Sequence, residues 1–160
     1  MTKSIARVLL VLLVIGCQET ENLQLPEIAE NGIKIGNQVW MKRNLDLKTF
    51  ENGDEIFHAS NQADWNKAYL EKIPAWSYYD NVEENGQIYR LIYNYYAIID
   101  SRGLAPTNWR IPTISDWNEL FKYNGGVLLA GIKLKSADRW INGNGTNESG
   151  FNALAGGERY

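Results

Sequence analysis

The residues that could act in catalysis are few and widely separated. His58 is the sole histidine, and Ser60 lies two positions after it, so a histidine-activated serine nucleophile is one arrangement to consider. Glycoside hydrolysis instead requires two carboxyl groups that flank the scissile bond. The scattered acids that could supply such a pair are Asp54, Asp80, Asp100 and Asp116. A serine near a histidine is common by chance, so we interpret His58 as a loop residue and assign no catalytic residue.

Oxygen-bearing side chains are concentrated in a glycine-rich loop at residues 142–150. Calcium takes about six to eight oxygen ligands, which carboxylates, amides, hydroxyls and backbone carbonyls can supply. The candidate ligands in this loop are Asn142, Asn144, Thr146, Asn147 and Glu148. A single carboxylate predicts weak calcium affinity, and Asn-Gly pairs are also typical of tight turns. A structural loop is the preferred interpretation, and no other cofactor is expected.

A second candidate site is the region between Tyr69 and Tyr96, which is dense in aromatic residues. Aromatic faces stack on sugar rings, and tyrosine hydroxyls suit polar partners. The candidate ligand-binding residues are Trp76, Tyr78, Tyr79, Tyr95 and Tyr96. The expected ligand is a glycan or a surface protein. The alternative, preferred for any one of these residues, is packing in the domain core.

The first 16 residues have the features of a signal peptide. Lys3 and Arg7 supply positive charge, and an unbroken apolar run follows at residues 8–15. As a helix this run would span about 12 Å, well short of the roughly 30 Å hydrocarbon core of a bilayer. It leads into Gly16-Cys17, which resembles the lipobox of bacterial lipoproteins. We therefore predict a signal peptide at residues 1–16 and lipidation of the Cys17 thiol.

Lipidation would hold the protein on a membrane, because each buried methylene contributes about 0.8 kcal/mol. Gln18, in place of aspartate, favours the outer membrane, so we expect the protein there or on the cell surface. Residues 17–31 carry Pro26 and no apolar periodicity, and are interpreted as a tether that reaches at most roughly 50 Å. Cys17 is the only cysteine, which excludes intrachain disulfides, a cysteine nucleophile and a thiolate zinc site.

The charge balance argues against a nucleic-acid partner. The full chain has a net charge of −3, and loss of the two basic residues of the leader leaves −5. No cluster of lysine and arginine occurs along the chain, so a phosphate backbone has no basic surface to bind. Of the 160 residues, 144 follow the leader, which is enough for one domain with a core.

A helix that begins after Thr113 is the best-defined element of the chain. Pro112 keeps the preceding residue extended, and Thr113 with Asp116 three positions later forms a capping-box pattern. Asn124-Gly125-Gly126 predicts the end of the helix. Its inward face is predicted to carry Trp117, Leu120 and Phe121.

Strands are expected on both sides of this helix. Gly36-Asn37 between two short apolar runs predicts a β-hairpin with a type II′ turn. Residues 75–79 and 88–99 are rich in β-formers and predict two strands, although the second could be a buried helix. Alternation at 132–135 predicts an edge strand with its lysines in water. The other expected elements are a turn at 51–54, a core segment at 151–154, and a short helix at 64–72 with Trp65, Ala68 and Tyr69 inward.

Many short motifs occur in a fixed order between residues 32 and 160. They are Gly36–Met41, Asn44-Leu45, Thr49–Asp54, Ala75–Asp80, Tyr93-Asn94 with Tyr96-Ala97, Arg102–Pro106, Gly143–Phe151, and Ala153-Leu154 with Gly156-Gly157. Together they closely resemble the Fibrobacter succinogenes major paralogous domain, a family of bacterial secreted proteins and lipoproteins. Arg110–Thr113 followed by Trp117 also resembles the helix start of formylglycine-generating-enzyme-like domains, which are related to C-type lectins.

The resemblance implies a compact, irregular α+β domain over residues 32–160, similar to C-type lectins and sulfatase-modifying factors, with a twisted antiparallel sheet and few short helices. Family members usually continue beyond Gly156-Gly157 into further strands, so the C-terminal part of the pattern is expected to be missing. Formylglycine generation needs cysteine chemistry, which a lipidated Cys17 cannot supply, so that activity is not carried over.

These observations predict a lipid-anchored protein of the outer membrane or cell surface whose domain binds a glycan or a protein without catalysis, as in adhesion. Two alternatives stay open. One is a hydrolase of envelope or plant-type polysaccharide that uses a carboxylate pair. The other is a structural subunit of a surface coat.

Overall fold

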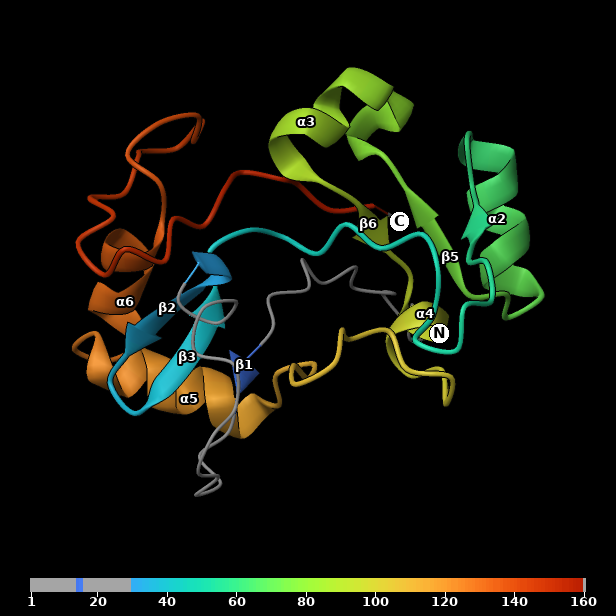
Figure 1. The fold of residues 1–160 in the computed structure, drawn as a ribbon. Coiled ribbons are helices and arrows are strands. Elements are labelled where there is room, and N and C mark those ends of the chain that lie inside the picture. The colour runs from blue at the N-terminus through green and yellow to red at the C-terminus, as the bar shows by residue number, and fades with distance from the viewer. Residues whose placement is uncertain (1–13, 16–29, 160) are drawn as a thin grey trace, which may run out of the picture. The chain divides into compact units, whose positions relative to one another are not determined.

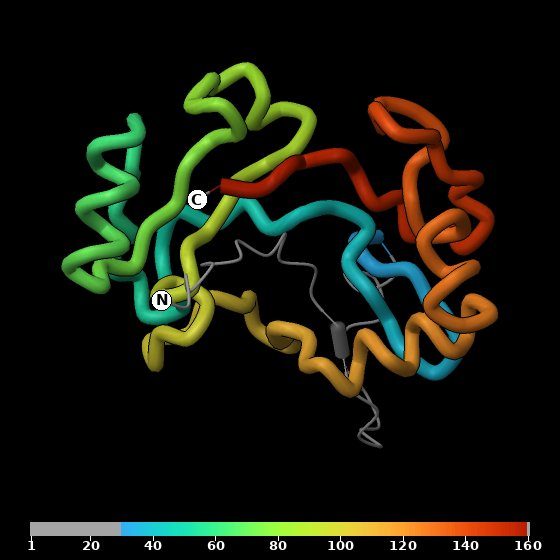
Figure 2. The backbone as a smooth tube through the Cα atoms, turned by 180° about the vertical axis from the view of Figure 1, so that it is seen from behind, coloured from blue at the N-terminus to red at the C-terminus, as the bar shows by residue number. Residues whose placement is uncertain are grey.

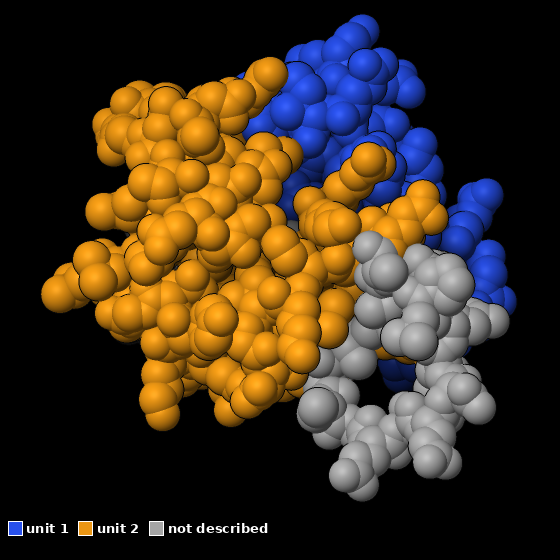
Figure 3. All heavy atoms as spheres, turned by 60° about the vertical axis from the view of Figure 1, so that its left-hand side comes forward, with its two compact units in different colours: residues 1–11, 44–107, 156–160 blue, residues 12–43, 108–155 orange. Residues whose placement is uncertain are grey.

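The structure, a computed structural model, describes residues 14–15 and 30–159 (Figure 1). Cys17 and nearly all of the predicted signal peptide and tether lie outside the described residues. The chain forms two compact units, coloured separately in Figure 3. Of the described residues, unit 1 contains 44–107 and 156–159, and unit 2 contains 14–15, 30–43 and 108–155.

Unit 2 contains an antiparallel sheet of three strands in the order β1-β3-β2. The strands are β1 (Val14–Ile15), which lies within the predicted signal peptide and would be removed with it, β2 (Gly32–Ile35) and β3 (Gln38–Met41). Between β2 and β3, Gly36 has a φ of 61° while Asn37 is not among the residues with positive φ, as a type II′ turn requires. Glycine adopts this conformation without a steric penalty, and the predicted hairpin is confirmed.

Two helices of unit 2, α5 (Ile114–Tyr123) and α6 (Val127–Leu134), follow an extended segment. The predicted capping box is confirmed, because the Thr113 hydroxyl accepts from the Asp116 N–H and the Asp116 carboxylate accepts from the Thr113 N–H. α5 ends before Gly125-Gly126, where φ values of 93° and 87° turn the chain into α6. Figures 1 and 2 show α5 beside the β2–β3 hairpin.

The core of unit 2 lies between the hairpin and the two helices. Trp40 is fully buried, with its ring centroid 4.9 Å from that of Trp117 and 5.5 Å from that of Phe151. Trp117 and Phe121 pack partly buried against the cluster, as predicted for their face of α5. The buried members of the cluster are Ile35, Trp40, Leu120, Ala130, Leu134 and Phe151.

The predicted edge strand at residues 132–135 is wrong. Residues up to Leu134 belong to α6, and Lys135 forms only an isolated bridge with Ala153. Four alternating residues also fit a helix, and here Ala130 and Leu134, four positions apart, both face the core. Burial of those two side chains therefore decides for the helix.

Unit 1 contains a second three-stranded sheet, in the order β4-β5-β6. Its strands are β4 (Phe57–His58), β5 (Ala75–Ser77) and β6 (Ile92–Tyr93). β4 and β5 are parallel and are joined through α2 (Gln62–Leu70), whereas β5 and β6 are antiparallel. The remaining elements are short helical turns: η1 (Tyr79–Asn81), η2 (Glu83–Asn85), α3 (Gly86–Tyr89) and α4 (Tyr95–Ile98). Two small sheets with several short helices confirm the predicted α+β class.

The helix predicted at residues 64–72 is present as α2. Trp65 and Ala68 are buried in the core of unit 1, as predicted. Tyr69 was predicted to point inward, but its side chain is 46% exposed. The cap explains the earlier start of α2, because the side chain of Asn61 accepts from the Asp64 N–H at 2.9 Å.

The segment at residues 88–99 is neither one strand nor one helix. Asn94 interrupts it, because its Oδ1 accepts from the N–H groups of Ala75 and Ala97, both at 3.0 Å. Its Nδ2 donates to the Ile73 carbonyl at 2.7 Å. One side chain therefore ends β6, caps α4 and holds both to β5. In the described part of the chain, no helix is long and apolar enough to cross a bilayer.

Candidate binding cleft

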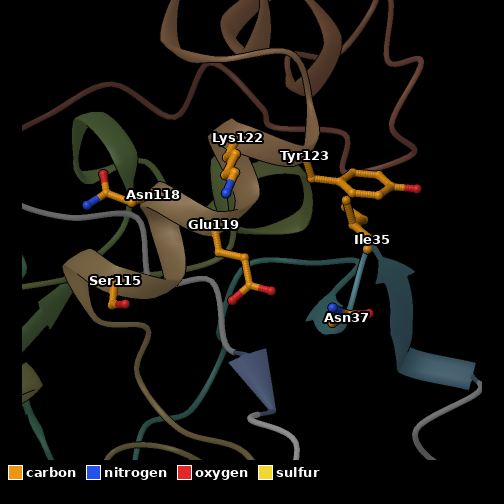
Figure 4. A pocket seen from close by; sticks show the side chains of 8 residues that line it. Ile35, Asn37, Ser115, Asn118, Glu119, Lys122 and Tyr123 are labelled. Atoms are coloured by element: carbon orange, nitrogen blue, oxygen red, sulfur yellow. The ribbon is translucent and has the colours of Figure 1, made fainter.

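A cleft of about 690 Å³ lies in unit 2 between the β2–β3 turn and the outer face of α5. Figure 4 shows Asn37 on the turn and Glu119 and Lys122 on the helix side. The residues that line the cleft are Ile35, Gly36, Asn37, Ser115, Asn118, Glu119, Lys122 and Tyr123. Its polar groups are hydroxyls, amides, one carboxylate and one ammonium group.

The polar side chains of the cleft form one stripe on α5. Asn118 and Glu119 follow Ser115 by three and four positions, and Lys122 follows them by four and three, which places all four on the same helix face. All four are exposed. Their side chains, and that of Asn37, form no hydrogen bond or ion pair with other residues that the structure describes. Their hydrogen-bonding groups are therefore open to a ligand from solvent.

Tyr123 borders this stripe with its ring against the hairpin turn. A Cβ added at Gly36 would lie 2.8 Å from the Tyr123 Cδ2, so only glycine admits the ring at this distance. The side chain of Tyr123 remains 66% exposed. Since Gly36 also needs its positive φ for the turn, one residue both shapes the hairpin and seats an exposed aromatic ring.

A network of polar groups, buried except at Arg110, fixes α5 to β3 and so positions the stripe. The Arg110 guanidinium donates to both carboxylate oxygens of Asp116, at 2.5 Å and 2.6 Å. The Asp116 carbonyl accepts from the Gln38 amide at 3.1 Å, and the Gln38 Oε1 accepts from the Trp40 indole at 3.1 Å. The Arg110 contact, with those from Thr113, holds the pKa of the Asp116 carboxyl well below its usual range.

Two of the aromatic residues proposed from the sequence form a cluster in unit 1. Trp76 is buried, and its indole N–H donates to the Ile56 carbonyl at 3.0 Å. His58 stacks on the Trp76 ring at 3.9 Å and 4°, and the half-buried Tyr78 meets both rings edge-on. The pKa of His58 is lowered, mainly by partial burial and then by the nearby Lys48 ammonium.

The other three proposed aromatic residues lie apart from this cluster. Tyr79 is half-buried with its ring centroid 5.2 Å from that of Tyr89. Tyr95 is 56% exposed and meets the half-buried Tyr96 edge-on at 5.8 Å. Within the described residues, no ring contact joins these pairs to Trp76 and Tyr78. None of the five lines the cleft of unit 2.

Most side-chain oxygens of the loop proposed for calcium contact residues of unit 2 that lie just outside the loop. Asn144 Oδ1 accepts from the Trp140 N–H at 3.0 Å, and Asn147 Oδ1 accepts from the Asn152 N–H at 2.8 Å. The hydroxyl of Thr146 faces the Ile132 carbonyl at 3.4 Å, and Glu148 pairs with Lys133 at 3.1 Å. The side chain of Asn142 forms no hydrogen bond with another described residue. The described residues contain no group of three or more histidine, cysteine, aspartate or glutamate side chains that could hold a metal ion.

Most of the residues considered for catalysis have structural partners. The Ser60 hydroxyl donates to Asp64 at 3.0 Å, at the start of α2, and not to His58. Asp54 and Asp100 both contact the Arg102 guanidinium, at 3.1 Å and 2.9 Å, and this contact lowers the pKa of Asp100 to about 2. Asp116 is paired with Arg110, as described above, and Asp80 is exposed with a φ of 55°.

The sequence contains the polar stripe, but nothing in it distinguishes the stripe from an ordinary solvated helix face. The hairpin and α5 were both predicted, whereas their meeting at Gly36 and Tyr123 depends on the packed core. A tyrosine immediately after a polar stripe of this spacing is the one signal that could have indicated the cleft.

The model of the Fibrobacter succinogenes major domain matches residues 33–160. No curated protein and no solved structure matches the chain.

Proposed function

The chain belongs to the Fibrobacter succinogenes major domain family, and from this premise we propose that it is a lipid-anchored glycan-binding protein of the outer membrane or cell surface. The glycan binds without turnover in the cleft between the β2–β3 turn and α5. The observation that carries the proposal is the stripe of unpartnered polar groups beside the exposed ring of Tyr123.

A sugar presents hydroxyl groups at its edge and C–H groups on its faces. The amides of Asn37 and Asn118 can each donate and accept, and the Glu119 carboxylate can accept from two neighbouring hydroxyls. The ring of Tyr123 offers a surface for the C–H face. The volume of about 690 Å³ falls in the range of about 300–1,000 Å³ that is usual for small-ligand sites.

The acids of the cleft favour binding over hydrolysis. Of the described residues that line it, Glu119 alone carries a carboxylate. Glycoside hydrolysis needs a second carboxyl group about 5–9.5 Å from the first. Asp54, Asp100 and Asp116 are each held by an arginine, which keeps them ionised and occupied. This supports a binding role and disfavours the hydrolase alternative.

The anchor is proposed from the sequence. A basic start, a short apolar run and Gly16-Cys17 are the parts of a lipoprotein signal, and the 14 residues that follow Cys17 have the composition of a spacer. A module held at the surface presents its cleft to external glycans and can attach the cell to them.

The cleft is tested by a glycan array probed with the purified full chain in detergent micelles. Tyr123→Ala should weaken retention of the selected glycan about tenfold, because an aromatic platform contributes on the order of 1 kcal/mol beyond the area it buries. Glu119→Gln should weaken it less, since the amide keeps one acceptor.

The matched control is Tyr95→Ala, which removes a comparably exposed tyrosine from unit 1 and should leave retention unchanged. Equal losses in Tyr123→Ala and Tyr95→Ala, or release of shortened sugar from the bound polysaccharide, would contradict the proposal.

A further inference from the structure

We propose that α6 is a second membrane contact, whose outward side chains insert into the lipid–water interface beside the anchor. The outward set, called here the α6 apolar face, consists of Val127, Leu128, Leu129 and Ile132. These side chains are 75%, 92%, 51% and 51% exposed. The inference rests on the lipid anchor proposed above and does not depend on the glycan cleft.

Leu128 and Ile132 of the apolar face lie opposite the part of α6 that packs in the core. Ala130 and Leu134, four positions apart, are buried in the cluster around Trp40. Leu128 and Ile132, also four positions apart, are displaced by about half a turn and therefore point away from that core. A surface helix normally has polar residues on this side. Contiguous exposed apolar side chains mark an interaction surface.

The charges around the face fit a lipid headgroup layer. The charged residues of α6 and its C-terminal cap are Lys133 and Lys135, both basic. Lys135 Nζ donates to the Gly143 carbonyl at 2.7 Å, and Lys133 forms an ion pair with the exposed Glu148. Basic residues that border a leucine-rich face are typical of interfacial helices, because they attract anionic lipids.

The tether brings this face within reach of a bilayer. Cys17 is followed by 14 residues before β2 begins at Gly32, which limits the anchor-to-sheet distance to roughly 50 Å. β2 belongs to unit 2, the unit that contains α6. The anchor therefore keeps unit 2 at a high effective concentration near the bilayer. Insertion of α6 then occurs even if its affinity for lipid is too weak to hold an unanchored protein on the membrane.

The cysteine content allows a direct test in the full lipidated chain. Cys17 is the only natural cysteine and its thiol is occupied by lipid in the anchored protein, so Leu128→Cys supplies one free thiol for an environment-sensitive fluorophore. The protein is reconstituted in vesicles of equal parts phosphatidylethanolamine and phosphatidylglycerol, with or without doxyl-labelled lipid. The fluorophore at residue 128 should shift to the blue and be quenched severalfold more strongly than one attached at Ser101→Cys, an exposed turn residue of unit 1.

Ile132→Cys provides a second probe of the same face and should give the same result. An aqueous, unquenched signal at both positions in vesicle-bound protein would overturn the inference. So would a blue shift in lipid-free detergent solution that rises with protein concentration, since it would assign the face to a second copy of the chain. Mass spectrometry of Cys17 in the same sample separates failure of the anchor, which leaves the cysteine unmodified, from failure of the insertion.

Discussion

At the residue scale, Asp116 joins three parts of unit 2. Its carboxylate binds the Arg110 guanidinium and the Thr113 N–H, and its carbonyl accepts from Gln38 of β3. The side chain is only 11% exposed, whereas that of Arg110 is 42% exposed. Because the helix cap, the ion pair and the contact to the sheet share one residue, substitution of Asp116 should weaken the attachment of α5 to β3 and so affect both sides of the cleft.

Asp116→Asn should lower the free energy of unfolding by roughly 2 kcal/mol at pH 7, the sum of a weakened cap and a broken charged hydrogen bond. The folded-state pKa of Asp116 lies below the unfolded value, so the carboxylate contributes its stability above that value, about 3.9, and loses it as the pH falls further. Urea unfolding should therefore show a difference between wild type and variant that narrows below about pH 4.

Glu119→Gln is the matched control, because it removes an exposed carboxylate from the same helix. It should change the midpoint little at any pH. A difference between wild type and Asp116→Asn that stays constant from neutral pH to pH 3 would show that the carboxylate is not stabilised by these contacts.

At the element scale, prediction succeeded where the signal is local. Thr113 and Asp116 mark the start of α5 within four residues, and Gly36 fixes the hairpin turn in the same way. α6 was missed because four alternating residues suit a strand or a helix, and its burial against Trp40 decides between them. The cleft was also missed, because it depends on contacts between distant parts of the chain: its two sides are more than seventy residues apart in sequence.

Asn94 is the clearest case of an element set by a distant contact. Its side chain is buried and forms three hydrogen bonds, to Ile73, Ala75 and Ala97. Asn94→Ala should lower the free energy of unfolding by about 3 kcal/mol, because each bond contributes about 1 kcal/mol and the partners remain buried.

The measurement is urea unfolding, with Asn66→Ala as the control for loss of an amide. Asn66 is exposed on α2 and contacts only the side chain of Gln62 among the described residues, so its removal should cost less than about 0.5 kcal/mol. Similar losses in the two variants would mean that Asn94 does not hold β6 and α4 to β5.

At the scale of the whole molecule, the family assignment and the α+β class were both accessible from the sequence, because many ordered motifs support the first and mixed periodicities the second. The division into two units was not. No local signal in the chain marks residue 108 as a boundary between the two units.

The anchor prediction also belongs to this scale. Cys17→Ala should abolish incorporation of labelled fatty acid in a bacterial host, because the acceptor thiol is gone. The readout is the acyl label on the immunoprecipitated protein. Gln18→Ala is the control and should keep the label. Label on the alanine variant, or none on the wild type, would contradict the anchor.

The two units are interleaved along the chain. Unit 1 resumes at residue 156 after unit 2 has been completed, and there Arg159 lies 4.6 Å over the Trp65 ring and donates to the Ser77 hydroxyl. A break at any position between 44 and 155 therefore separates parts that one of the units needs. Genetic recombination within this span would divide a unit between two genes, so the two units can be exchanged or duplicated only as a single block of inheritance.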